Sequence, residues 1–306
     1  MDTLKGFFLA NYWRKTFFTT GTVTAFLSAL GFFWLLTEIS AFVVESWKTQ
    51  LQSAWMYFIA LSAIYTLWSR KPVLVIKERL NNTDIQIEVR ISNIFSIPAA
   101  YVISTNTTFD TEVNEKIIST KSIQGAFTNH FYDNIQHLDS DIANALEYED
   151  IASSRASNVG GKTDLYNIGA VAKIMPKKQS AYLLAISQLN KDGVAESSFE
   201  DVKIALASLW NYISSKGSYE PLAIPILGTG HGRINTPRDV VIKEIIRSFI
   251  AACSERKFTN KLTVVIAPRD YHDHALDIYE IGEFLKYVCK YTEIFSTTVG
   301  TGKATD

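Results

Sequence analysis

The chain has 306 residues, of which 47% are hydrophobic and 20% charged, and its formal net charge is −1. This length allows one or two domains, and the near-neutral balance leaves no excess of lysine and arginine to neutralise the phosphates of a nucleic acid. Cys253 and Cys289 are too few and too scattered for a disulfide framework or a thiolate metal site. His272 and His274 could touch one metal ion, but no nearby cysteine completes a ligand set. We therefore expect no metal, no nucleic-acid partner, and a solvated pair of loop histidines.

Two uncharged runs follow a short, aromatic and basic segment over residues 1–15. The runs cover residues 16–37 and 49–69, and each exceeds the roughly 20 residues that cross a hydrocarbon core of about 30 Å. No small-residue cleavage site marks the first run as a signal peptide. Two such runs within the first 70 residues fit a membrane hairpin better than buried helices of a soluble core. We therefore expect a transmembrane helical hairpin over residues 16–71.

Basic residues set the expected orientation of this hairpin. The connection over residues 38–48 carries two acids and a single lysine, whereas both outer flanks are basic. The positive-inside rule then places both termini in the cytoplasm and the protein in the inner (plasma) membrane. Because neither run contains a charge that could mark a substrate path, a transporter is a poor alternative. The basic residues of the flanks are Lys5, Arg14, Lys15, Arg70, Lys71, Lys77 and Arg79.

The first run is rich in threonine and also contains Gly21, Ser28 and Gly31. Small and hydroxylated residues permit close contact between helices in lipid, which would suit assembly of several hairpins. Alternatively, each threonine hydroxyl simply bonds the carbonyl four residues earlier in its own helix. The sequence leaves both interpretations open. The threonines are Thr16, Thr19, Thr20, Thr22 and Thr24.

Residues 72–295 have the composition of a soluble domain, and the polar tail over residues 296–306 is expected to be disordered. Apolar alternation and short apolar runs predict strands, and apolar periodicity of 3.6 residues predicts helices. Strands alternating with helices indicate an α/β sheet covered by helices. The expected strands are Val73–Ile76, Ile85–Ile91, Ala99–Ile103, Asp164–Ile174, Tyr182–Leu189, a short one within Pro221–Ile226, and Leu262–Ala267. The expected helices are Gly125–Leu146, Glu200–Ser215 ending at a C′ glycine (Gly217), Pro237–Cys253 and Ile278–Val288.

A glycine-rich stretch, Leu227–Arg233, follows the short apolar strand. Its glycines let the backbone turn with several N–H groups free to face an anion. Thr236 as N-cap and Pro237 at the first helical position predict the start of a helix, and the dipole at a helix N-terminus also favours an anion. The stretch lacks the lysine of a Walker loop and comes too late in the domain for a Rossmann fingerprint. It therefore predicts a phosphate-bearing ligand, or else a strand-to-helix turn that merely needs glycine.

The order of these motifs resembles a macro domain, a three-layer α/β/α fold that binds ADP-ribose. Ile224–Gly230 looks like the diphosphate loop of that family, and Ala99–Asn106 resembles its strand and ribose-side loop. Ser122–Phe127 looks like a degraded form of the segment that opens its next helix. The resemblance covers about residues 73–288, and the diphosphate loop is its most specific part. With two spans in front, the chain is similar to the transmembrane–macro effectors of type II Thoeris antiphage systems.

That resemblance implies a function and its partners. In such systems a TIR-domain enzyme makes a signal from NAD, an ADP-ribose conjugated to histidine, and the macro domain receives it. The membrane part is then thought to assemble into a homo-oligomer and disrupt the lipid bilayer. The implied ligand is thus a nucleotide second messenger, an ADP-ribose derivative, and no cofactor is implied.

The resemblance also implies which residues bind. Backbone N–H groups over Gly228–Gly232 would hold the diphosphate, Asn106 would lie near the distal ribose, and Asn93 takes the place of an acid that recognises the adenine amino group. Arg233 could pair with a phosphate or a conjugated carboxylate, or form an ion pair with Asp239 or Glu244. Tyr271 could stack on adenine or pack in the core. The full expected set is Asn93, Asn106, Gln124, Gly125, Leu227, Gly228, Thr229, Gly230, His231, Gly232, Arg233, Asp270 and Tyr271.

Departures from the macro pattern favour binding over hydrolysis. Ile103 replaces the first of two ribose-loop asparagines, Gln124 replaces an acid, and Ser119–Ser122 replaces a glycine run. Neither Ile103 nor Gln124 can act as a general base for water. We expect a ligand-binding effector with no catalytic residue. The alternative is a membrane-tethered ADP-ribose hydrolase or deacylase that works through Asn106 or His231.

Overall fold

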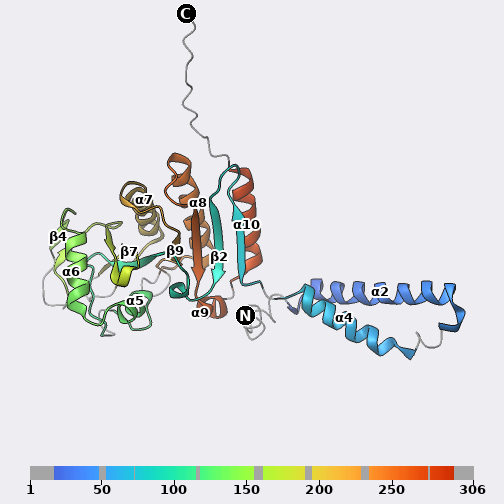
Figure 1. The fold of residues 1–306 in the computed structure, drawn as a ribbon. Helices are drawn as coiled ribbons and strands as arrows, with labels where there is room; N and C mark the ends of the chain where they lie inside the picture. Colours follow the sequence, from blue (N-terminus) through green and yellow to red (C-terminus); the bar gives the residue numbers. More distant parts are fainter. Residues whose placement is uncertain are drawn as a thin grey trace, which may run out of the picture. The chain divides into compact units, whose positions relative to one another are not determined.

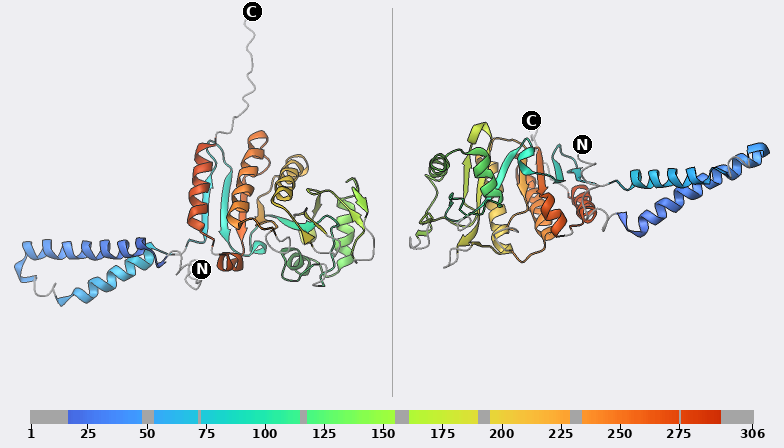
Figure 2. Two further views of the ribbon diagram at one scale, coloured as in Figure 1. Left: turned by 180° about the vertical axis from the view of Figure 1, so that it is seen from behind. Right: turned by 90° about the horizontal axis from the view of Figure 1, so that it is seen from below.

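The computed structural model describes residues 17–47, 53–71, 73–114, 118–154, 161–189, 195–228, 234–274 and 276–292. The chain divides into two compact units, one of residues 1–74 with 269–277, the other of residues 75–268 with 278–306 (Figures 1 and 2). The basic segment over residues 1–15 and the polar tail over residues 296–306 lie outside the described residues.

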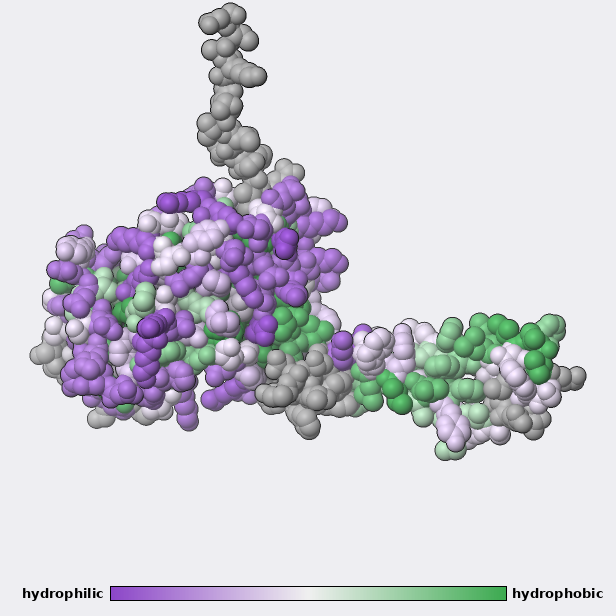
Figure 3. All heavy atoms as spheres, viewed as in Figure 1, coloured by the Kyte–Doolittle hydropathy of each residue, from purple (hydrophilic) through white to green (hydrophobic). Residues whose placement is uncertain are grey.

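The first unit contains two apolar helices, α2 (Thr20–Val43) and α4 (Trp55–Ser69), with a short turn η2 (Glu45–Trp47) after α2. Among the described helices, α2 alone is long and apolar enough to cross a membrane, and α4 is a shorter apolar helix of 15 residues. Large apolar side chains cover the outside of both helices (Figure 3). Helix α2 extends beyond the uncharged run that ends at Thr37. It continues through Glu38 to Val43, because one charged side chain does not interrupt backbone hydrogen bonding and the next residues are again apolar.

The contact between α2 and α4 combines small and hydroxylated side chains with one pair of phenylalanine rings. Phe33 of α2 stacks on Phe58 of α4 with their ring centroids 6.2 Å apart. At the open end of the hairpin, Arg70 Nη2 donates to Thr19 Oγ1 over 3.1 Å. Close approach of small residues is the usual way in which helices pack in lipid. The most buried residues of the pair are Thr22, Ala29 and Thr37 in α2 and Ser62 and Thr66 in α4.

The hydroxyls of this pair bond within their own helices. Thr24 Oγ1 donates to the Thr20 carbonyl over 3.0 Å, and Thr37 Oγ1 to the Phe33 carbonyl over 2.8 Å. Thr66 Oγ1 donates in the same way to the Ser62 carbonyl over 2.7 Å. For these side chains the structure supports the bond to the carbonyl four residues earlier, which also keeps hydroxyl groups satisfied in an apolar environment.

The second unit is built on one mixed sheet, in which the strand order is β1-β2-β10-β9-β3-β7-β6 and β8 pairs with β7. The five strands from β2 to β7 in this order run parallel, whereas β1, β6 and β8 are antiparallel to their neighbours. The strands are β1 (Val75–Arg79), β2 (Gln86–Ile91), β3 (Ala100–Asn106), β6 (Val171–Ile174), β7 (Ala181–Leu189), β8 (Ala195–Glu196), β9 (Leu222–Pro225) and β10 (Lys261–Ile266). A separate pair joins β4 (Ser153–Ser154) to β5 (Asp164–Leu165).

Helices cover both faces of the sheet, which confirms the three-layer α/β/α architecture (Figure 2). One face packs against α5 (Ile123–Phe131) and α6 (Ile135–Ala145), where Phe127 and Leu138 join the core side chains of β3 and β7. The other face packs against α7 (Phe199–Lys216), α8 (Arg238–Glu255) and α10 (Ile278–Tyr291). Burial on both sides explains why the central strands are apolar throughout.

Four local predictions were wrong. The single helix expected over residues 125–146 is two helices, because Asn134 caps α6 by accepting a hydrogen bond from the Gln136 backbone N–H. Helix α8 begins at Arg238 with Pro237 at the N-cap, so Thr236 is not the cap. Gly217 has φ −74° and does not use the left-handed region. The strand expected over residues 164–174 is interrupted between β5 and β6, where Gly169 turns the chain with φ +90°.

Candidate functional site

The parallel strands of the second unit end at the same edge of the sheet. β3 ends at Asn106, β9 at Pro225 and β2 at Ile91, so the loops that carry Asn106, Gly228 and Asn93 all leave from this edge. Ligands of open α/β sheets bind outside the carboxyl ends of their strands. The strand directions therefore bring three of the predicted binding segments to the same edge of the sheet, at the carboxyl ends of its parallel strands.

The loop after β9 begins with a tight turn at Gly228. Its φ of +68° lies in the left-handed region, and its carbonyl accepts a hydrogen bond from the Ile234 N–H over 3.2 Å. A Cβ at this position would lie 2.0 Å from Ile234 Cδ1. Leu227 beside it is fully buried and anchors the turn in the core. The contact between Gly228 and Ile234 holds the two ends of the loop together. Thr229, Gly230, His231, Gly232 and Arg233 lie outside the described residues, so their binding roles stay predictions.

The loop after β3 is organised by the side chain of Asn106. Its Nδ2 donates to Asp110 Oδ2 over 2.8 Å, and its Oδ1 accepts from the Asp110 N–H over 3.1 Å. Thr108 Oγ1 lies 2.5 Å from the same Asp110 oxygen and 3.0 Å from Asn106 Oδ1. Asn106 is 6% exposed and Asp110 1% exposed. The residues between them therefore form a closed loop around a buried carboxylate.

Asp110 also joins this loop to two distant segments. Its Oδ1 accepts from the Lys162 N–H over 2.6 Å, and its carbonyl accepts from Gln124 Nε2 over 2.7 Å. A second acid, Asp139, accepts from Thr111 Oγ1 over 2.7 Å and pairs with Lys162 Nζ over 2.7 Å. The sequence interpretation missed Asp110. The signal available was an acid four residues after Asn106, at the end of a threonine-rich loop.

The start of α5 explains the glycine at position 125. Ser122 caps the helix because its Oγ accepts from the Gly125 N–H over 2.9 Å. A Cβ on Gly125 would lie 2.3 Å from the Ser119 carbonyl oxygen, so only glycine fits without moving the backbone. Gln124 is 9% exposed, and its amide is held by Asp110. The structure thus brings Asn106, Gln124 and Gly125 together, and their contacts with a ligand stay predictions.

The remaining predicted residues have different surroundings. Asn93 is exposed and caps the short helix η3 (Ile94–Ser96) with its Oδ1, which accepts from the Phe95 N–H over 3.1 Å. Asp270 and Tyr271 lie in α9 (Pro268–Asp273), within the segment grouped with the hairpin unit. Tyr271 is 4% exposed. The proposed adenine contacts of these residues stay predictions.

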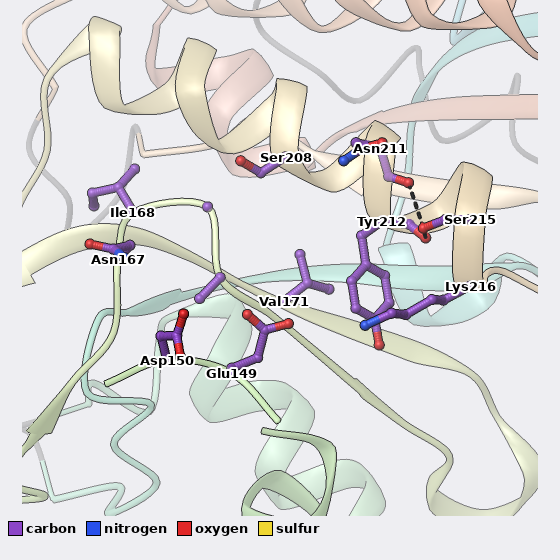
Figure 4. Close-up of a pocket in the computed structure, with 12 residues that line it drawn as sticks. Glu149, Asp150, Asn167, Ile168, Val171, Ser208, Asn211, Tyr212, Ser215 and Lys216 are labelled. Carbon is purple, nitrogen blue, oxygen red and sulfur yellow. Dashed lines mark hydrogen bonds between the residues drawn. The ribbon is translucent and has the colours of Figure 1, made fainter. Parts of the chain in front are cut away.

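A separate groove of about 380 Å³ runs beside α7 and does not include any predicted binding residue (Figure 4). Lys216 Nζ lies over the Tyr212 ring, 5.1 Å from its centroid. Burial and the nearby charge of Glu149 raise the pKa of the Tyr212 hydroxyl. Within the described residues, no group of three or more histidine, cysteine, aspartate or glutamate side chains could hold a metal ion.

Comparison with known proteins identifies the family. The family model for the macro domain of Thoeris protein ThsA matches residues 87–267, from the start of β2 to just past the end of β10. The chain belongs to the ThsA macro-domain family. Thoeris protein ThsA of Bacillus amyloliquefaciens (strain Y2) is 26% identical over 215 residues, covering 68% of this chain and 70% of that protein. The resemblance to macro domains and to Thoeris proteins drawn from the sequence is confirmed.

Solved macrodomain structures are also similar to this ThsA-like chain. The Oceanobacillus iheyensis macrodomain with ADP has a TM-score of 0.46 and 14% identity, covering 71% of this chain and 98% of that one. The Trypanosoma brucei macrodomain in complex with ADP-ribose has a TM-score of 0.43 and 10% identity, covering 67% of this chain and 72% of that one.

Proposed function

We propose that this chain is a membrane effector of bacterial antiphage defence, whose macro domain binds an ADP-ribose-derived signal. The observation that carries the proposal is the turn at Gly228. It closes a glycine-rich loop at the carboxyl end of β9, in a chain of the ThsA macro-domain family. Backbone N–H groups of such a loop, next to the start of α8, suit a diphosphate.

The ligand we propose is histidine–ADP-ribose made by a TIR-domain enzyme. The diphosphate lies on the loop after Gly228, and the distal ribose lies by the loop that begins at Asn106. Arg233 pairs with the histidine carboxylate or with a phosphate, because its guanidinium donates to either group bidentately. We assign the domain a receptor role rather than a hydrolase role. The aliphatic side chain of Ile103 and the amide of Gln124 cannot act as a general base to activate water.

The membrane part of the proposal rests on the hairpin. α2 spans the bilayer, and α4, which covers about 22 Å at 1.5 Å per residue, returns across a locally thinned bilayer. Both termini then lie in the cytoplasm, where the signal is made. Ligand binding drives association of several copies, and the assembled hairpins disrupt the membrane.

Binding is tested with the full chain in detergent, by titrating ADP-ribose and histidine–ADP-ribose in a calorimeter and recovering the ligand for mass spectrometry. We expect both to bind, the conjugate more tightly, and both to be recovered intact. Arg233→Ala should lower the affinity for histidine–ADP-ribose by about tenfold or more, because a charge-assisted hydrogen-bonded pair is lost. Lys257→Ala, which removes an ion pair to Asp84 elsewhere on the domain, should leave affinity unchanged. Failure of both nucleotides to bind would refute the proposal, and their conversion would instead establish the hydrolase.

A further inference from the structure

The Asn106 amide is already in use inside its own loop. Its Oδ1 faces the Asp110 N–H at 3.1 Å and the Thr108 hydroxyl at 3.0 Å, and one Nδ2 hydrogen is donated to Asp110. A threonine hydroxyl has one hydrogen to donate, and the shorter Thr108 contact is to Asp110, so the bond from the Asp110 N–H is the one that holds the Asn106 oxygen in the loop. With 6% of the residue exposed, little of the amide reaches the surface of the sheet edge.

Asp110 in turn depends on this arrangement. Its buried carboxylate accepts from Asn106 Nδ2 and from the Lys162 N–H, and the Thr108 hydroxyl lies 2.5 Å from the same oxygen as Asn106 Nδ2. A buried carboxylate is costly unless donors surround it, and bonds to an ionised acceptor are stronger than neutral ones. The pair therefore fixes the path of the loop after β3 relative to the segment around Lys162.

We infer that Asn106 and Asp110 form a positioning pair, and that a nucleotide at this edge contacts the shape and backbone of the loop rather than the Asn106 amide. The ligand half of this inference rests on the proposed function, whereas the pairing itself does not. It changes the role that the family resemblance gave Asn106, from direct contact with the distal ribose to support of the loop that contacts it.

Exchange of the two side chains separates the alternatives. Asn106→Asp alone sets two carboxylates against each other, and Asp110→Asn alone sets amide N–H groups against Asn106 Nδ2 or the Lys162 N–H. In the exchanged double variant, Asn106→Asp with Asp110→Asn, the amide oxygen at position 110 accepts from the Lys162 N–H. The amide nitrogen at position 110 donates to the carboxylate at position 106. That aspartate still accepts from Thr108 and from the backbone N–H at position 110. Every bond of the pair is thus restored while the Asn106 amide is gone.

The experiment measures the melting temperature and the ADP-ribose affinity of the full chain in detergent for the wild type, both single variants and the exchange. We expect each single variant to lose about 5 °C or more and about tenfold or more in affinity, because donors or acceptors are left unpaired. The exchange should recover at least half of the melting temperature and bring the affinity to within about threefold of the wild type. Where a single variant does not fold, recovery in the exchange carries the comparison.

Two results would overturn the inference. An exchanged variant with the melting temperature of the wild type but about tenfold lower affinity for ADP-ribose would show that the ligand contacts the Asn106 amide itself. An exchanged variant less stable than both single variants would show that the two side chains are not a pair. A wild-type chain that binds no ADP-ribose refutes the proposed function instead, and the melting temperatures then still decide the pairing.

Discussion

Replacement of Gly228 by alanine tests the turn that opens the loop after β9. An L-residue in the left-handed region that Gly228 occupies, at φ +68°, costs about 1–2 kcal/mol. The new Cβ would also lie 2.0 Å from Ile234 Cδ1 and 2.9 Å from Ile234 Cγ1. Because these atoms are the end of a flexible, half-buried side chain, we expect them to move at a cost of about 1–2 kcal/mol rather than to prevent folding.

The two costs together predict a loss of about 2–4 kcal/mol, or a melting temperature lower by about 5–15 °C. A double-variant cycle separates them. In the background of Ile234→Ala, which removes both contacting atoms, Gly228→Ala should cost only the conformational part of about 1–2 kcal/mol.

Chemical denaturation of the full chain in detergent measures the free energy of unfolding of the wild type, the two single variants and the double variant. An ADP-ribose titration of the same samples measures how far the loop after Gly228 still binds the nucleotide. The affinity of Gly228→Ala should fall by about tenfold or more, because the N–H groups after the turn are redirected. The same penalty with and without the Ile234 side chain would refute the steric part of the reasoning. A variant as stable as the wild type would refute the turn itself.

Three further predictions concern other parts of the domain. Burial alone would raise the pKa of the Glu88 carboxyl, but hydrogen bonds from a lysine and an arginine outweigh it and hold the pKa below its ordinary 4.5. The stability from this charge is present above pH 4.5 and is lost as the pH falls through the lowered pKa. Glu88→Gln should therefore flatten the decline in melting temperature below pH 4.5, and an unchanged decline would contradict this. Gly125→Ala should cost about 2–3 kcal/mol in denaturation, because its Cβ meets the Ser119 carbonyl, whereas a neutral effect would mean that the start of α5 shifts freely. Burial raises the pKa values of Cys253 and Cys289 to about 12, so both thiols stay protonated at pH 8 and a thiol reagent should label them only on unfolding. Rapid labelling of the native chain would show that the core opens.

The features that could be predicted well from the sequence are those that depend on the pattern of a few consecutive residues. The apolar run over β10 and the alternating glycines after β9 each involve a few consecutive residues, so the strand and the turn at Gly228 could be inferred without knowing their neighbours. The apolar α2 was visible for the same reason. The uncharged run alone does not give the end of this helix, because α2 continues through Glu38 as long as its backbone hydrogen bonds do.

The missed features depend on contacts between distant segments. Asp110 accepts from Lys162, 52 residues later in the chain, and no spacing within the Asn106 loop indicates that partner. Glycine suits position 169 because its φ is +90° and because a Cβ there would lie 2.5 Å from Ser208 Oγ of α7, which again is a tertiary contact. The break before α6 was readable, since Asn134 is a good N-cap, but the continuous apolar periodicity on either side concealed it.

Release of a dye from liposomes that contain the full chain tests the central claim most directly. Vesicles of bacterial phospholipid are loaded with a self-quenched dye, and histidine–ADP-ribose is added to the side that exposes the macro domain. The proposed function predicts that leakage begins only when the nucleotide is added, and that Gly228→Ala needs about tenfold more nucleotide for the same rate. Leakage that is equal with and without the nucleotide would contradict gating by the signal. Intact vesicles at saturating nucleotide would contradict membrane disruption.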